Sequence, residues 1–289
     1  MSKTLAPSVT SRDPKGSKFM SVVEAAYNKA RLSHDEAQRV NETPGLSEVI
    51  AQFVAQARWP NKFCCEEVAS NYGYSSGYKI RGITEQVHIL RTIGFPDLSA
   101  NEKISELPLP AGAEGWFAIP KWQRLAGTYG EAVEKVLAAI KRTRNGKFAN
   151  YCSEALGPEY LRQSALTSLG LGMIEEEQKG YNVLVVPAQF GYSHGGHSIR
   201  RSLEVMGDYE FGLGAFAVGI MLLTHPERFS SHNDLCIDCS GDELAPLADS
   251  QFVMAPCFEL GDDLTVSFCG RYTNDADGVF GSVSGFLPG

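Results

Sequence analysis

The chain has 289 residues, of which 43% are hydrophobic and 21% are charged, close to the average of soluble globular proteins. This composition excludes a largely disordered chain and a fibrous or repetitive one, because it provides enough apolar volume for a core. The formal net charge is −8, and the segment from Asp234 to the C-terminus carries ten acidic residues with Arg271 as its one basic residue. An acidic chain argues against general nucleic-acid binding, which depends on Lys and Arg contacts to phosphates.

The sequence also argues against secretion and membrane insertion. Residues 1–18 are polar and contain no apolar run of the kind a secretory signal needs. The longest apolar stretch, Phe211 to Leu223, is too short to span a membrane and predicts a buried core helix. Seven cysteines without regular spacing favour free thiols over a disulfide framework. We therefore expect a cytoplasmic protein.

Residues 1–18 lack periodicity and predict a mobile N-terminal arm, through which copies of the protein could associate. Residues 19–110 show helical spacing, most clearly in the apolar series Leu46, Val49, Ile50, Phe53, Val54 and Ala57. Capping boxes are predicted at Ser33 with Glu36, Ser99 with Glu102 and Thr128 with Glu131.

Residues 111–289 predict a mixed region in one continuous domain with the helical part. Its expected helices are Tyr129 to Thr143, Pro158 to Lys179, Ser198 to Met206 and Tyr209 to Leu223. Its expected strands are a short one around 115–120, Asn182 to Val186, Leu235 to Asp238, and a hairpin of Cys257 to Leu260 with Leu264 to Phe268. The predicted fold class is α+β, with a helical N-terminal half and antiparallel strands at the end.

The densest candidate site is the loop Gly191 to Arg201, between an expected strand and an expected helix. Such junctions are favoured ligand positions because a helix N-terminus presents free N–H groups. Gly191, Gly195 and Gly196 allow close backbone approach, and Arg200 and Arg201 could hold a small anionic ligand. The alternative is a glycine-rich turn whose arginines are solvated or paired with acidic residues of the chain.

The segment GYSHGG within this loop resembles the nucleophile elbow of the α/β-hydrolase family. The resemblance covers six residues, while the helical region before it and the order of acidic residues and histidines depart from the family pattern. It implies Ser193 as a nucleophile, with His194 or His197 as the base and a nearby acid for which Asp238 is our candidate. Whether the protein is an enzyme stays open at this point.

A zinc site is a further candidate for the same region. His194 and His197 are three residues apart, and Cys236 and Cys239 form a C-x-x-C pair. On a strand, however, Cys236 and Cys239 would point to opposite faces. The sequence thus supports three functional hypotheses: a small-anion-binding protein that could be a hydrolase, a non-catalytic assembly protein, and a nucleic-acid-associated protein using the basic residues of 79–81 and 141–147.

Overall fold

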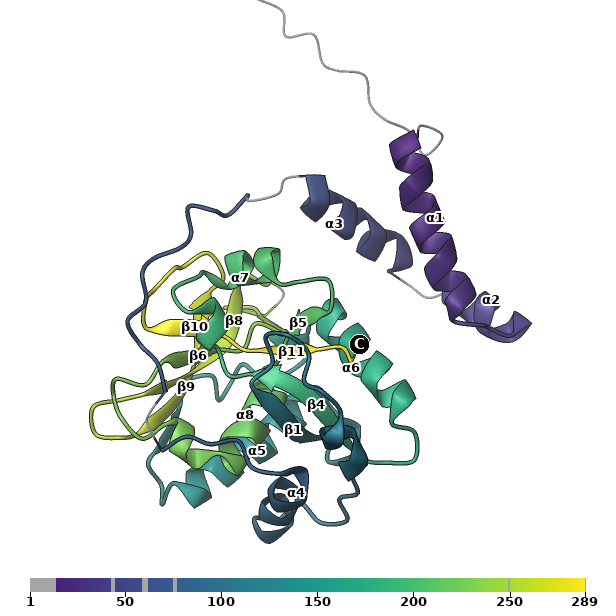
Figure 1. The fold of residues 1–289 in the computed structure, drawn as a ribbon. Coiled ribbons are helices and arrows are strands. Elements are labelled where there is room, and N and C mark those ends of the chain that lie inside the picture. The colour runs from purple at the N-terminus through teal and green to yellow at the C-terminus, as the bar shows by residue number, and fades with distance from the viewer. Residues whose placement is uncertain (1–13, 43–44, 59–61, 75–76, 249, 289) are drawn as a thin grey trace, which may run out of the picture. The chain divides into compact units, whose positions relative to one another are not determined.

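The protein has an α+β fold, as the sequence predicts (Figure 1). The computed structural model describes residues 14–42, 45–58, 62–74, 77–248 and 250–288. The chain divides into two compact units, Met1–Arg58 and Trp59–Gly289. The predicted arm of residues 1–18 falls outside the described residues up to residue 13, and a helix begins at Pro14. The sequence placed the change from helical to mixed structure near residue 110.

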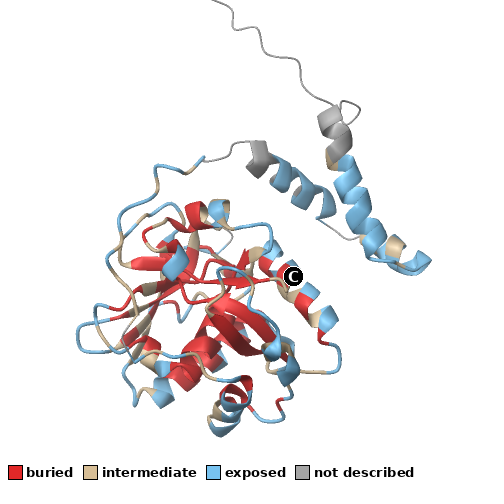
Figure 2. Cartoon of the chain, viewed as in Figure 1, coloured by how far each residue is buried: buried red, intermediate tan, exposed pale blue. Residues whose placement is uncertain are grey.

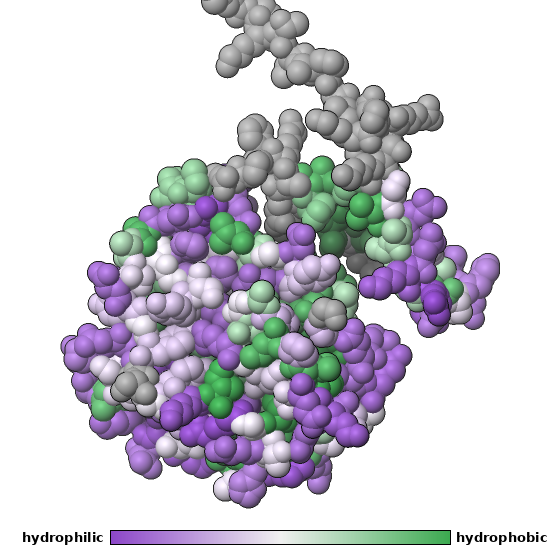
Figure 3. Space-filling view, in the orientation of Figure 1, coloured by the Kyte–Doolittle hydropathy of each residue, from purple (hydrophilic) through white to green (hydrophobic). Residues whose placement is uncertain are grey.

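The first unit is helical. It contains α1 (Pro14–Lys29), α2 (His34–Glu42) and α3 (Leu46–Arg58). The capping box before α2 is confirmed, since the Ser33 N–H donates to Glu36 and the Glu36 N–H donates to the Ser33 hydroxyl. These helices are coloured as exposed over most of their described residues (Figure 2), and hydrophobic residues are visible at their surface (Figure 3). The large exposed apolar residues are Met20, Val22, Val23, Tyr27, Leu46, Val49, Ile50, Phe53 and Val54.

The second unit contains the remaining elements. Its helices are α4 (Ile83–Thr92), α5 (Tyr129–Thr143), α6 (Ala165–Glu177), α7 (Ile199–Val205) and α8 (Ala215–Thr224), with short 3₁₀ helices η1 (Glu102–Glu106), η2 (Trp122–Arg124), η3 (Tyr192–His194) and η4 (Pro226–Arg228). Its strands are β1 (Gly115–Pro120), β2 (Phe148–Asn150), β3 (Leu161–Gln163), β4 (Val183–Gln189), β5 (Glu210–Gly212), β6 (Cys236–Asp238), β7 (Asp242–Leu244), β8 (Met254–Leu260), β9 (Val266–Tyr272), β10 (Phe280–Ser282) and β11 (Ser284–Phe286).

These strands form two sheets. The four-stranded sheet has the order β1-β4-β11-β5, with antiparallel pairs throughout. The second sheet has the order β10-β6-β8-β7-β3, and β9 joins β8 to β2. The predicted C-terminal hairpin is confirmed as β8 and β9, which pair antiparallel over their full lengths.

The core lies around α8, in which every residue is buried (Figure 2). Its apolar composition on all sides is typical of a helix enclosed by other elements. Gly219 lies so close to α5 and β8 that a Cβ there would come within 2.4 Å of Val136 and 3.6 Å of Phe258. The capping box at Thr128 and Glu131 is confirmed at the start of α5.

Several expected elements begin elsewhere. The helix expected from Pro158 begins at Ala165, where Ser164 caps α6. The strand β3 occupies the residues just before this cap. The helix expected from Tyr209 starts at Ala215, because residues 210–212 pair with β11. The box predicted at Ser99 is wrong: Ser99 bonds to Asn182, while Glu102 accepts from Thr84.

The helical pattern predicted for residues 19–110 is also interrupted. Residues 62–82, where described, form no helix. This segment belongs to the second unit, and isolated β-bridges join Glu67 to His197 and Gly73 to Asp234. The basic residues of 79–81, which the nucleic-acid hypothesis uses, therefore lie in an irregular segment. None of the described helices combines the length and apolarity needed to cross a membrane.

Candidate functional site

The Gly191–Arg201 loop follows β4 and is held closely by two other segments. Gly191 has a φ of 110°, and a Cβ there would lie 2.8 Å from the Gly281 carbonyl oxygen of β10. Gly196 has a φ of 82°, and a Cβ there would lie 2.1 Å from the Val68 carbonyl oxygen. Both glycines are thus needed for conformation and for space. Gly195 forms a bridge to Gly281. These glycines allow the loop to pack directly against the backbone of Val68 and of Gly281 in β10.

The two histidines of the loop lie near each other, with ring centroids 6.0 Å apart. His194 is buried, and its Nε2 lies 2.7 Å from Oε1 of Glu210. Burial acts to raise the pKa of Glu210, but the hydrogen bonds from His194 and Ser284 outweigh it and hold that pKa below its usual value. Burial lowers the pKa of His197. Among the described residues, neither histidine's Nδ1 has a hydrogen-bond partner.

Ser193 and Asp238 do not join these histidines. Ser193 is exposed on η3, and no hydrogen bond between its hydroxyl and a described histidine is present. Asp238 is fully buried on β6, where it accepts hydrogen bonds from Arg271 at 3.0 and 3.2 Å. Burial raises the pKa of Asp238 to about 6 in spite of the Arg271 guanidinium. The predicted serine, histidine and acid are therefore not in catalytic contact in this structure.

The two arginines of the loop already hold carboxylates of the chain. Arg200 donates to both oxygens of Glu66, from Nε at 2.7 and 2.9 Å. Arg201 pairs with Glu67 and, at 2.9 Å, with Glu204. The hydrogen bond from Arg200 holds the pKa of Glu66 below its usual value. The acidic partners thus come from the segment before α4 and from α7.

The structure does not bring the four predicted zinc ligands together. Cys239 is fully buried in the core, while Cys236 is half-buried on β6. Among the described residues, the group of His, Cys, Asp or Glu side chains with donor atoms close enough for one ion is Cys257, Glu259 and Cys269. His194 and His197 belong to no such group.

A pocket of about 420 Å³ lies beside the start of the loop, lined by Tyr74, Tyr78, Lys79, Ile80, Glu114 and Tyr192. The Tyr74 ring meets Tyr78 and Tyr192 edge to face, with centroids 5.2 and 5.8 Å away. The irregular segment before α4 supplies the first four residues, and Glu114 directly precedes β1. Tyr192 is the contribution of the predicted loop. We call this the tyrosine pocket.

Hydrogen bonds fix the polar part of the tyrosine pocket. The Tyr74 hydroxyl donates to Oε1 of Glu114 at 2.7 Å and accepts from the Tyr192 N–H at 2.9 Å. Oε2 of Glu114 and the hydroxyl of Tyr78 are buried and have no partner among the described residues. Burial raises the pKa of Glu114 and of both tyrosines.

Arg228 supports the pocket from behind and is fully buried. Its guanidinium carbon lies 4.1 Å from the centre of the Tyr74 ring, a cation–π contact. Its Nη2 donates to the backbone carbonyls of Phe190 and Leu235 at 3.1 and 2.8 Å. Burial lowers the pKa of Arg228. The buried cation therefore orients Tyr74, the residue that fixes Glu114.

A larger cavity of about 580 Å³ lies between α5 and the turn after α4. The basic residues Arg124, Lys135 and Arg142 line it together with Asp97. Lys135 and Arg142 donate to the backbone carbonyls of Leu125 and Ile93. None of the buried polar atoms without a partner among the described residues lies in this cavity.

Sequence reasoning did not assign a site to Tyr74, Tyr78, Glu114 or Arg228. The signal that could have found the first two is the run of tyrosines among glycines and serines at 72–78, which differs from a helical pattern. Glu114 and Arg228 carry no local signal, because their role depends on contacts between distant segments. Comparison of the chain with protein-family models, with curated proteins and with solved structures finds no match.

Proposed function

We propose that the protein binds a small organic cation, an amine or a quaternary ammonium group, in the tyrosine pocket. The observation that carries this proposal is Oε2 of Glu114, a buried carboxylate oxygen without a partner among the described residues, in a pocket lined by three tyrosines. An unpaired buried polar atom destabilises a fold by about 1–3 kcal/mol. Its retention in a pocket therefore favours a ligand that completes the pairing.

The tyrosine rings and Glu114 suit the same ligand class. Aromatic faces attract cations through the ring quadrupole, and groups of such rings recognise quaternary ammonium ligands. Glu114 supplies a full negative charge when it is ionised. The volume of about 420 Å³ lies within the range of small-molecule sites. Lys79 at the rim and Arg228 behind Tyr74 are both positively charged and oppose a further positive charge, so the expected ligand carries a single one.

Calorimetric titration with choline and with its neutral isostere 3,3-dimethylbutan-1-ol tests this proposal, since the two ligands differ in charge and hardly in shape. We expect choline to bind and the isostere to bind at least about tenfold more weakly. Glu114→Gln should lose choline binding, whereas Tyr151→Phe, at a tyrosine that is 75% exposed outside the pocket, should not. Equal binding of the two ligands, or unchanged binding by Glu114→Gln, would refute the proposal.

A small anion is a second candidate ligand, at a site other than the Gly191–Arg201 loop for which the sequence predicted one; its best support is the basic cavity at Arg124, Lys135 and Arg142. Arg124 is exposed there and the cavity is large enough for a phosphate-sized group. Titration with inorganic phosphate tests it. Binding that weakens with added salt and is lost in Arg124→Gln supports an anion site, and binding unaffected by that substitution argues against it.

An assembly role is supported by the first unit. Val49, Ile50, Phe53 and Val54 of α3 are 36–57% exposed, and exposed apolar patches commonly mark interaction surfaces. We expect the full chain to self-associate in a concentration-dependent way by analytical ultracentrifugation. The variant Val49→Asp/Phe53→Asp should be monomeric if α3 forms the contact, and a wild-type chain that is monomeric throughout would exclude this role. We place the protein in the cytosol, which agrees with its free thiols.

A further inference from the structure

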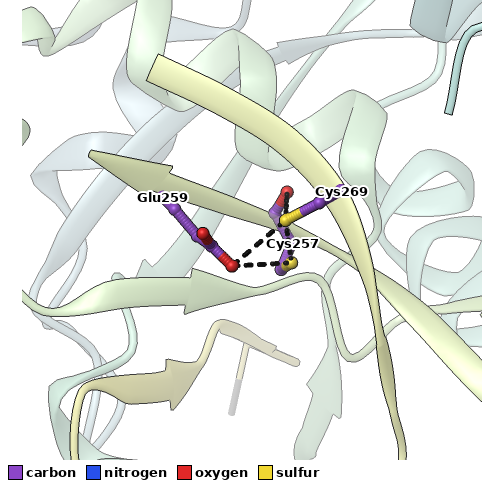
Figure 4. Close-up of side chains that lie close together, drawn as sticks. All are labelled: Cys257, Glu259 and Cys269. Carbon is purple, nitrogen blue, oxygen red and sulfur yellow. Dashed lines mark hydrogen bonds between the residues drawn. The ribbon is translucent and has the colours of Figure 1, made fainter. Parts of the chain in front are cut away.

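The β8–β9 hairpin carries a second group of reactive side chains, outside the tyrosine pocket. Cys257 on β8 and Cys269 on β9 are directly opposite each other in the antiparallel register. Glu259 follows Cys257 by two residues, so it points to the same face of the sheet. Figure 4 shows the three side chains converging on one point. The pattern sets three possible ligand atoms on one rigid hairpin.

The distances fit a three-ligand site with a small adjustment. Oε1 of Glu259 lies 3.1 Å from the Cys269 Sγ and 3.7 Å from the Cys257 Sγ. The two sulfurs are 2.7 Å apart. A tetrahedral zinc ion with Zn–S bonds of about 2.3 Å would hold two sulfurs about 3.8 Å apart. Binding therefore requires the two sulfurs to separate by about 1 Å, through movement of the partly exposed Cys269 side chain, which also changes its distance to Glu259.

Access and charge agree with ion binding. Cys257 is buried, whereas Cys269 and Glu259 are partly exposed, so a cation can reach the donors from solvent. Once the two thiols have lost their protons, a divalent cation offsets the repulsion among the two thiolates and the Glu259 carboxylate.

We propose that Cys257, Cys269 and Glu259 bind one thiophilic divalent cation of the zinc type, with a fourth coordination position open to solvent. Binding replaces two S–H bonds by two metal–sulfur bonds and releases two protons, with no change in oxidation state. Three protein ligands with one open position is the arrangement of reactive rather than purely structural zinc sites. The site differs from the zinc site expected from the sequence, which used His194, His197, Cys236 and Cys239.

Cobalt titration of the reduced, metal-free protein tests the site. The titration is performed in a Cys64→Ser/Cys65→Ser background, because these two exposed cysteines could bind metal non-specifically. We expect thiolate-to-cobalt charge-transfer absorption that saturates at one equivalent, tetrahedral d–d bands, and displacement of cobalt by zinc. Metal binding should also weaken as the pH falls, because two protons compete with the ion.

Cys257→Ser and Cys269→Ser should abolish the charge-transfer band. Glu259→Gln, at a partly exposed position that does not threaten folding, should weaken cobalt binding more than about tenfold, since even outer-shell substitutions weaken metal sites about 10- to 100-fold. A titration of the Cys64→Ser/Cys65→Ser protein without charge-transfer absorption would overturn the proposal, as would unchanged affinity after adding Glu259→Gln to it. It would also be overturned by a purified protein whose mass shows a Cys257–Cys269 disulfide and which binds no cobalt after reduction.

Discussion

The Gly191–Arg201 loop and the tyrosine pocket adjoin at Tyr192, yet they differ in how their polar groups are paired. In the loop, Arg200 and Arg201 form ion pairs with Glu66, Glu67 and Glu204, although Nδ1 of His194 and of His197 has no partner among the described residues. In the pocket, Glu114 and Tyr78 keep buried polar atoms that have no partner among the described residues. The paired arginines of the loop contribute to folding, whereas the unpaired groups that line the pocket are candidates for ligand binding.

The largest effect that this comparison predicts is on stability, through the two arginines. Arg228→Met leaves the buried Phe190 and Leu235 carbonyls without their donor, at about 1–3 kcal/mol each, so we expect the free energy of unfolding to fall by about 3 kcal/mol. Arg200→Met, whose side chain is 40% exposed, should lower it by about 1 kcal/mol at most. Urea denaturation of both variants provides the measurement, and similar losses would remove the contrast between the regions.

The next effect concerns the backbone of the loop. Gly196→Ala places a methyl group 2.1 Å from the Val68 carbonyl at a positive φ, and we expect a loss of about 2–3 kcal/mol. The matched control is Gly172→Ala within α6, where the added methyl meets nothing within 4 Å and should stabilise the protein by about 0.5–1 kcal/mol. Thermal or chemical denaturation separates the two. A neutral Gly196→Ala would mean that the loop is not held against residue 68.

A smaller effect is the pH dependence of binding in the tyrosine pocket. Burial raises the pKa of Glu114 above that of an ordinary carboxyl, and only the ionised form attracts a cation. Choline affinity should therefore be full above this raised pKa and fall by up to about tenfold per pH unit below it. Calorimetry over a pH series checks this, with Glu114→Gln as the comparison. A wild-type affinity that rises on acidification would contradict the assignment of Glu114.

The smallest expected effect is that of Ser193→Ala. Ser193 is exposed and has no hydrogen bond to the histidines, so stability should change by less than about 0.5 kcal/mol and choline binding should not change. The hydrolase hypothesis predicts loss of turnover on an ester and phosphoester panel for the same variant. If the wild type shows turnover and Ser193→Ala does not, Ser193 is required for catalysis and the catalytic site lies in the loop.

Local signals explain why part of the fold was predictable. The apolar spacing and the Thr128 box define α5, and the β-branched run before Pro187 defines β4. The β8–β9 hairpin follows from two apolar runs separated by Gly261, Asp262 and Asp263. In each case the residues that determine the element lie within it.

Other elements depend on partners distant in sequence, which a local pattern does not reveal. Residues 210–212 become β5 because β11 pairs with them, although the apolar run alone favours a helix. The same limit applies to the candidate sites. The loop was found through its own glycines and histidines, but Glu114 and Arg228 reach the tyrosine pocket from segments far from Tyr74. Glu66 and Glu67, which pair with Arg200 and Arg201, likewise lie more than a hundred positions away, whereas Glu204 is a near neighbour of Arg201 in sequence.

The position of β11 between β4 and β5 has a consequence for the nascent chain. Both neighbouring strands leave the ribosome well before residues 284–286 are made, so each carries an unpaired edge during synthesis. The central gap in the four-stranded sheet closes only when this late segment arrives. The four-stranded sheet is therefore expected to form only after residues 284–286 have been made, with chaperone contacts concentrated on shorter nascent chains.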